Sequence, residues 1–121
     1  MIKNKKGRII NISSIFGVVS KEMRSAYSSS KFGILGLTKS SALDLANKNI
    51  LVNSISPGFI NTELTRRILK KSGMKIMAKT IPLKRVGKVE EIALLTVFLC
   101  SNYNTYITGQ NIVIDGGFTV K

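Results

Sequence analysis

The chain contains no histidine and no tryptophan, only one cysteine, and two prolines among its 121 residues. Without histidine it lacks the commonest general base and the commonest metal ligand, and we expect no metal site. A single cysteine excludes an internal disulfide, and we expect Cys100, at the end of an apolar run, to be buried. The longest apolar run, residues 92–100, is too short to span a bilayer. With no signal-peptide core at the N-terminus, these features predict a soluble, cytoplasmic protein without a membrane partner.

Acidic residues are also scarce, and this leaves a strongly basic chain. Six Asp and Glu stand against 19 Lys and Arg, so the formal net charge is +13. Such a charge favours a polyanionic partner: nucleic acid, a membrane surface or a phosphorylated cofactor. The basic residues cluster in two places: Lys3, Lys5, Lys6 and Arg8, and again Arg66, Arg67, Lys70 and Lys71. Because no aromatic interleaving or nucleic-acid motif accompanies them, nucleic acid is disfavoured, and a lysine-rich composition explains part of the excess.

The hydrophobic pattern predicts three strands separated by helices. Short β-branched runs predict strands over residues 8–13, 50–55 and 111–114. Apolar residues at intervals of three and four predict helices over residues 25–47 and 89–100. We expect the first strand to be buried. Alternating strands and helices predict one α/β domain with a parallel sheet.

Two further stretches each allow two interpretations. Residues 59–85 form a polar, basic segment with one short helix predicted over residues 64–71, ended by Ser72 and Gly73. This segment is either a lid over a site or a surface excursion. The helix over residues 25–47 is crowded with small residues, including Gly33, Gly36 and Ser40. It is either a weak helix or one that another helix approaches closely.

Ser14, Tyr27 and Lys31 form the one constellation that indicates catalysis. Tyr27 and Lys31 are four residues apart and share one face of the predicted helix, and Ser14 follows the first strand. A hydroxyl, a phenol and an ammonium at one point suit proton transfer to or from a carbonyl or alcohol oxygen. Serine would donate a hydrogen bond to that oxygen, tyrosine would supply the proton, and lysine would favour the tyrosinate.

The tyrosine–lysine spacing alone is weak evidence, because 14 of the 121 residues are lysine. An exposed lysine one turn after a tyrosine is the more ordinary explanation. The strand order adds weight, since sites in parallel sheets lie beyond the carboxyl ends of the strands. Ser14 and the Pro57–Gly58 turn both follow strand ends, and the helix between them carries Tyr27 and Lys31. One edge of the sheet is therefore expected to present all of these residues.

Four blocks of sequence, in this order, resemble the C-terminal half of a short-chain dehydrogenase/reductase. They are GRIINISS with Ser14, the run from Tyr27 through three serines to Lys31, NSISPGFINT, and the pair PLKRVGKVEEIA and YITGQNIVIDGG. They are similar to the family's active-site serine, its Y-x-x-x-K motif, its proline–glycine segment beside the nicotinamide, and its closing helix and last strand. The resemblance covers nearly the whole chain and is nearest to 3-oxoacyl-[acyl-carrier-protein] reductases. It implies the C-terminal half of a Rossmann-like doubly wound parallel sheet, about three strands with flanking helices.

The resemblance also implies roles for individual residues. Hydride would pass between a nicotinamide and the carbonyl carbon of a small-molecule or carrier-bound substrate, such as a 3-oxoacyl group. The catalytic residues would be Ser14, Tyr27 and Lys31, and the cofactor-binding residues Tyr27, Lys31, Pro57, Gly58, Ile60 and Thr62. The cofactor would be NADP or NAD, with NADP slightly preferred. The helix over residues 25–47 would pack on its twin in another subunit, giving a homo-oligomer.

One family feature has no counterpart, namely the glycine-rich turn that holds the cofactor pyrophosphate. Gly33 and Gly36 lie inside a predicted helix and do not follow a strand. The nucleotide-binding N-terminal half is therefore expected to be absent, and residues 1–121 would form one partial domain. Two functions stay open: an NAD(P)-dependent oxidoreductase that is inactive as this fragment and complete only with an N-terminal half, or a non-catalytic remnant or basic module that binds polyanions.

Overall fold

Strands and helices alternate along the chain in the computed structural model, which describes residues 1–120. The elements are β1 (Gly7–Ile12), α1 (Ser25–Leu45), β2 (Ile50–Pro57), α2 (Glu63–Thr80), α3 (Val89–Cys100) and β3 (Asn111–Ile114), with short 3-10 helices η1 (Ile15–Gly17), η2 (Ala46–Lys48) and η3 (Phe118–Val120). The strands form one parallel sheet in the order β1-β2-β3. The predicted α/β class is confirmed.

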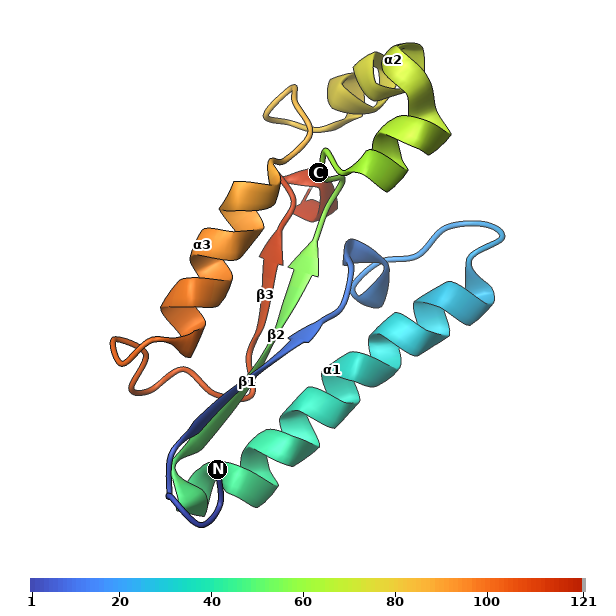
Figure 1. The fold of residues 1–121 in the computed structure, drawn as a ribbon. Helices are drawn as coiled ribbons and strands as arrows, with labels where there is room; N and C mark the ends of the chain where they lie inside the picture. The colour runs from blue at the N-terminus through green and yellow to red at the C-terminus, as the bar shows by residue number, and fades with distance from the viewer. Residues whose placement is uncertain (121) are drawn as a thin grey trace.

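The helices surround this sheet unequally (Figure 1). α1 and α3 lie on opposite sides of the sheet, whereas α2 stands beyond the carboxyl ends of the strands. The register pairs Gly7 with Ile50 and Ile12 with Ile55, so β1 and β2 end side by side. Since the chain crosses over through a helix between parallel strands, all loops that follow strand ends meet at one edge. That edge is the one near α2.

β2 is the centre of the core. Its residues from Ile50 to Ser56 are all buried, and Ile50 and Val52 pack with Ala42 of α1. The buried polar residues of this strand are paired: the Asn53 amide donates to Ile107 O at 2.7 Å, and the Ser54 hydroxyl donates to the Asn111 side chain at 2.9 Å. Unpaired polar groups would destabilise the interior, and these hydrogen bonds satisfy them. The same bonds hold β3 and the loop before it beside β2.

Two helix boundaries differ from the prediction. The helix expected to reach Asn47 is α-helical only to Leu45, and Asn49 then takes a left-handed conformation with φ 55° that ends the turn. α2 runs to Thr80 instead of ending at Ser72 and Gly73. It bends at Lys70, whose φ of 53° and ψ of −179° are not helical. The Ser72–Gly73 pair therefore predicted the end of α2 too early, because a glycine inside a helix weakens the helix without necessarily ending it.

Burial was also predicted incorrectly for strand β1 and for Cys100. β1 was expected to be buried, but it is an edge strand whose residues are partly accessible, and Ile12 is 48% exposed. Cys100 was expected to be buried but is exposed at the last position of α3. Apolar periodicity identifies a helix face, whereas burial also requires a partner for that face. Within residues 1–120, no helix combines the length and the apolar character needed to cross a membrane.

Candidate active site

Ser14 is held directly after the end of β1. The backbone N–H of Ser13 still donates to Ile55 O at 2.8 Å, which places Ser14 level with Pro57 at the end of β2. Ser14 caps η1, and its Oγ accepts a hydrogen bond from Phe16 N at 3.2 Å. This bond fixes the serine oxygen and leaves its own proton available to a further acceptor.

A glycine brings η1 against α1. A side chain at Gly17 would place its Cβ 2.6 Å from Ser13 Oγ and 2.8 Å from Lys31 O, closer than van der Waals contact permits. The Ser13 hydroxyl also donates to Lys31 O at 2.9 Å. The loop after β1 is therefore tied to the turn of α1 that carries Lys31.

Tyr27 and Lys31 lie at the same end of the sheet. Lys31 Nζ donates to the carbonyl oxygen of Ile12, the last residue of β1, at 3.2 Å and lies 5.7 Å from the centroid of the Tyr27 ring. The Tyr27 ring meets the Phe16 ring edge to face, with centroids 6.2 Å apart, and is 43% exposed. The structure thus brings Ser14, Tyr27 and Lys31 together at the carboxyl end of β1. Phe16 links Ser14 to this pair, because its N–H donates to Ser14 Oγ and its ring meets that of Tyr27.

Pro57 and Gly58 occupy the neighbouring strand end. Gly58 N donates to Ile114 O at 2.9 Å, and a Cβ on Gly58 would lie 2.7 Å from Asp115 Cα. Only glycine permits this close approach of the two strand ends. The turn therefore holds the end of β2 closely against the end of β3.

Ile60 and Thr62 lie farther along, where the chain leaves the sheet. Ile60 forms a parallel bridge with Gly87, and its carbonyl accepts from Thr62 N at 2.9 Å. Thr62 caps α2: its Oγ1 accepts from Thr65 N at 3.1 Å and shares a second bond with Thr65 Oγ1 at 2.9 Å. A hydroxyl has one donor and two acceptor positions, so capping leaves Thr62 capacity for one more partner.

Three phenylalanines extend the site in a way that the sequence pattern did not reveal. Phe59 lies 6.5 Å from Phe16 and 5.3 Å from Phe118, centroid to centroid, and both pairs meet edge to face. They border a mostly apolar groove of about 290 Å³ whose walls also include Val19 and Met77. We call it the aromatic groove; it is lined by Phe16, Val19, Ser20, Lys21, Phe59, Met77, Thr80 and Phe118. Because these residues come from four separate segments, no single periodicity could have identified it.

Asp115 holds in place the C-terminal turn that brings Phe118 to this groove. Its carboxylate accepts hydrogen bonds at 2.8 Å from Gly117 N, Thr119 N and the Thr119 hydroxyl. Burial alone raises the pKa of Asp115, but these bonds outweigh it and hold the pKa below its ordinary value. The ionised carboxylate closes the turn through Gly116 and Gly117, which both have positive φ. Asp115 therefore positions η3 and its Phe118.

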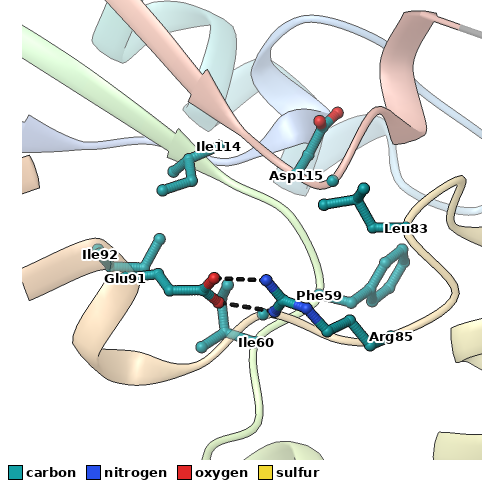
Figure 2. Close-up of a pocket in the computed structure, with 10 residues that line it drawn as sticks. Phe59, Ile60, Leu83, Arg85, Glu91, Ile92, Ile114 and Asp115 are labelled. Atoms are coloured by element: carbon teal, nitrogen blue, oxygen red, sulfur yellow. Dashed lines mark hydrogen bonds and ion pairs between the residues drawn. The ribbon is translucent and has the colours of Figure 1, made fainter.

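A smaller cavity lies between the two ends of the segment 59–85 and the start of α3 (Figure 2). Arg85 and Glu91 form a two-bonded ion pair across it, at 2.9 and 2.6 Å. The Arg85 hydrogen bond, with a second from Lys88 N, lowers the pKa of Glu91 to about 2. The cavity holds about 90 Å³, well below the roughly 300–1,000 Å³ of small-molecule sites. The Arg85–Glu91 pair that borders it ties the returning segment to α3.

The chain matches known proteins along almost all of its length. A family model described as enoyl-(acyl carrier protein) reductase matches residues 1–119. The 3-oxoacyl-[acyl-carrier-protein] reductase FabG of Thermotoga maritima is 42% identical over 120 residues, covering 99% of this chain and 48% of that protein. The chain thus spans about half the length of the curated relatives it matches.

Two solved structures match the fold closely. ElxO with NADP bound superposes with a TM-score of 0.93 at 32% identity, over 100% of this chain and 50% of its own. A short chain dehydrogenase family protein from Francisella tularensis gives 0.89 at 36% identity, over 94% of this chain and 51% of its own. In both, the match is confined to half of the other molecule.

Proposed function

Because the chain belongs to the short-chain dehydrogenase/reductase family, we propose that it supplies the catalytic half of an NAD(P)-dependent reductase. The reaction is hydride transfer between a nicotinamide and a carbonyl or alcohol carbon, and the proposed substrate is a 3-oxoacyl group carried as a thioester. The observation that carries this proposal is the convergence of Ser14, Tyr27 and Lys31 at the end of β1. Relatives of this chain are named as reductases of carrier-bound 3-oxoacyl groups.

The residues present fit a nicotinamide cofactor. Lys31 uses one of its three N–H donors on Ile12 O, which leaves two for the neighbouring hydroxyls of a ribose. Thr62 retains hydrogen-bonding capacity, and Pro57 and Gly58 lie at the end of β2, the strand next to the one that leads to Ser14. When bound, the cofactor supplies the hydride. Lys31, Pro57, Gly58, Ile60 and Thr62 would hold it.

The side chains divide the remaining work of reduction among them. Ser14, whose oxygen is fixed by Phe16 N, donates its proton in a hydrogen bond to the substrate carbonyl oxygen. As that oxygen gains negative charge, the Tyr27 hydroxyl transfers its proton to it, and an alcohol results. The Lys31 ammonium stabilises the phenolate that remains. The partly exposed Tyr27 regains a proton from solvent.

Two finer features belong to the same proposal. We infer NADP rather than NAD, since an extra phosphate suits a chain of net charge +13 and ElxO was solved with NADP bound. We also infer a homo-oligomer that assembles through the outer face of α1. A Cβ built on Gly33 or Gly36 meets nothing within 4 Å, so no part of residues 1–120 approaches these glycines. A second helix could pack there closely.

A chimera tests the catalytic assignment. This chain would replace the matching half of the Thermotoga maritima reductase, and NADPH oxidation would be followed with a 3-oxobutyryl thioester of N-acetylcysteamine. We expect turnover, and we expect Tyr27→Phe to lower kcat by about 10²–10⁴-fold, the usual contribution of a general acid. Unchanged thermal unfolding would exclude misfolding. Equal turnover in the Tyr27→Phe chimera would remove Tyr27 from the mechanism.

The chain without that added half should turn over no substrate. Positioning of reacting groups can supply about 7–11 kcal/mol, and pyrophosphate contacts normally come from a glycine-rich turn at a helix N-terminus. In this chain Gly33 and Gly36 lie within α1 instead. Calorimetric titration with NADPH should give weak or no binding. Micromolar affinity with turnover that Tyr27→Phe abolishes would contradict this expectation.

A further inference from the structure

Arg24 places a second cation beside Tyr27. The Cζ atom of its guanidinium lies 6.0 Å from the centroid of the Tyr27 ring and 5.9 Å from that of the Phe16 ring. Lys31 Nζ lies 5.7 Å from the same Tyr27 centroid. Lys31 is bonded to Ile12 O, whereas the Arg24 side chain has no hydrogen bond or ion pair within residues 1–120. Of the two cations beside the tyrosine, Arg24 is therefore the one with unused donors.

The position of Arg24 does not favour the helix that follows it. Arg24 is the N-cap residue of α1, its side chain makes no capping bond, and the first turn contains no acidic residue. Because the N-terminal end of a helix is electropositive, a cation there is destabilising. Glu22, the acidic residue nearest in sequence, forms no ion pair with it. The two aromatic rings hold the guanidinium in this unfavourable place, so an incoming anion would meet a cation that is already positioned.

The space around Arg24 suits a small anionic molecule. Residues 21–24 border an open hollow of about 400 Å³, and Lys21 also lines the aromatic groove. That volume lies within the roughly 300–1,000 Å³ of small-molecule sites. Lys21 and Arg24 are cationic, and Glu22 is the one acidic residue of this short loop. The loop therefore has a net positive charge at the point where the hollow and the groove share a wall.

We propose that Arg24 binds the carboxylate of a free 3-oxo acid while Tyr27 acts on the keto oxygen of the same molecule; this extends the substrate beyond a thioester and rests on the function proposed above. A planar guanidinium binds both oxygens of a carboxylate through two parallel N–H donors. In a 3-oxo acid, one methylene separates the carboxylate from the keto carbon. A cation that lies over the tyrosine ring can therefore hold one group while the other meets the phenol.

The carboxylate takes no part in the bonds that change. The free 3-oxo acid, NADPH and one proton give the 3-hydroxy acid and NADP⁺. A C–H bond forms at the keto carbon, the carbonyl oxygen becomes a hydroxyl with the Tyr27 proton, and the carboxylate leaves as it entered. An ester or a thioester presents a neutral carbonyl to Arg24 instead, and hydrogen bonds to a neutral acceptor are weaker than those to an ionised one. Arg24 should therefore matter most for the anionic substrate.

Two substrates that differ in charge test this role in the chimera. They are 3-oxobutanoate and its methyl ester, each assayed with NADPH. We expect Arg24→Gln to lower kcat/KM for the acid by about 10–100-fold and to change the value for the ester much less. Arg24→Lys should recover part of the activity on the acid, because it keeps the charge but loses the paired donors. The matched control, Lys3→Gln, removes one positive charge before the amino end of β1 and should leave both values unchanged.

Three outcomes would overturn the proposal. Equal losses on the acid and the ester would mean that Arg24 only supports the two aromatic rings. An equal loss on the acid in Lys3→Gln would indicate the general field of a basic protein. A wild-type chimera that reduces the ester but not the acid would show that no carboxylate is held. Thermal unfolding shows which variants fold, and Arg24→Lys, compared with wild type on both substrates, decides the question if Arg24→Gln does not.

A binding measurement separates failure of this role from failure of the proposed function. If the chimera reduces the thioester or the ester but not the acid, the role of Arg24 is wrong and the function stands. If it reduces none of them, the function is wrong, and binding alone decides the role of Arg24. Titration of the nitrogen-15-labelled chimera with 3-hydroxybutanoate should then shift the Arg24 Nε–H resonance, identified by its absence from Arg24→Gln. A resonance that does not move would overturn carboxylate binding.

Discussion

The two regions that border the aromatic groove are held in place very differently. On one side, β1, η1 and α1 are joined by short side-chain bonds, from Lys31 Nζ to Ile12 O and from Ser13 Oγ to Lys31 O. On the other side, the segment 59–85 is fastened at its ends, by the Ile60–Gly87 bridge and the Arg85–Glu91 pair. Between these ends, no residue of α2 is fully buried within the part of the chain described.

This difference separates two tasks. Reacting groups need fixed positions, because a small displacement from the productive geometry slows the reaction. A cover over the substrate needs to open and close, and elements with few buried contacts open at low free-energy cost. We therefore interpret the catalytic region as rigid and the segment 59–85 as a hinged lid. The following predictions test that contrast.

Removing the Lys31 ammonium should have the largest effect. Lys31→Met in the chimera removes the bond to Ile12 O, the ribose donors and the charge beside Tyr27 together. We expect kcat/KM for NADPH to fall by at least about 10²-fold, measured by steady-state kinetics. Lys31→Arg should rescue little, because a planar guanidinium does not replace a compact ammonium. Wild-type cofactor affinity and turnover in Lys31→Met would contradict both roles of this residue.

Filling the outer face of α1 should disrupt assembly while sparing the catalytic face. Gly36→Leu places a large side chain where a second helix is proposed to pack, and in a two-fold contact the clash occurs twice. We expect sedimentation of the chimera to shift from oligomer to monomer. Asn102→Leu, exposed in the loop after α3, is the control for added apolar surface. A chimera that is monomeric before mutation would exclude this interface.

Two glycine substitutions, one in η1 and one in α1, test whether the catalytic region is rigid. Gly17→Ala forces a Cβ to within 2.8 Å of Lys31 O, and overpacking of this kind destabilises by about 1–3 kcal/mol. In the Gly36→Leu background, where no second helix should cover α1, Gly33→Ala meets nothing within 4 Å and should stabilise the helix by up to about 1 kcal/mol. Denaturant unfolding of the chimera measures both. Equal effects would mean that η1 is not held against α1.

The smallest effect should come from the hinge of the lid. The pKa of Glu91 is lowered to about 2 in the folded chain, whereas an unfolded glutamate has a pKa of about 4.3. The ion pair between Glu91 and Arg85 therefore stabilises the fold fully above about pH 4.3. This stabilisation is lost as the pH falls toward the pKa of the folded chain.

Proteolysis can detect this local loosening. Glu91→Gln should speed tryptic cleavage within residues 64–84 a few-fold at neutral pH, with little change in global unfolding. Glu90→Gln, one residue earlier and outside both ion pairs, is the control. Identical cleavage of the two variants would mean that the Arg85–Glu91 pair does not anchor the lid.

Local sequence predicted the catalytic region better than the lid. Strand β2, helix α3 and the convergence of Ser14, Tyr27 and Lys31 follow from periodicity and from the rule that parallel strands end at one edge. In the segment 59–85, Ser72 and Gly73 predict the end of a helix, whereas the backbone of α2 breaks at Lys70 and then continues as helix to Thr80. The exposure of Cys100 could not be predicted, since burial depends on the surface that a helix face meets.

The accessible edge of β1 has a consequence for the behaviour of the protein in solution. An open strand edge presents unpaired backbone groups that can recruit another strand, and charged residues near such edges act as gatekeepers against aggregation. Lys3, Lys5 and Lys6 precede β1, and Arg8 lies within it. With a net charge of +13, mutual repulsion should keep molecules apart at low ionic strength. Colloidal stability should therefore decline as salt screens that repulsion, and light scattering of concentrated samples should rise with ionic strength.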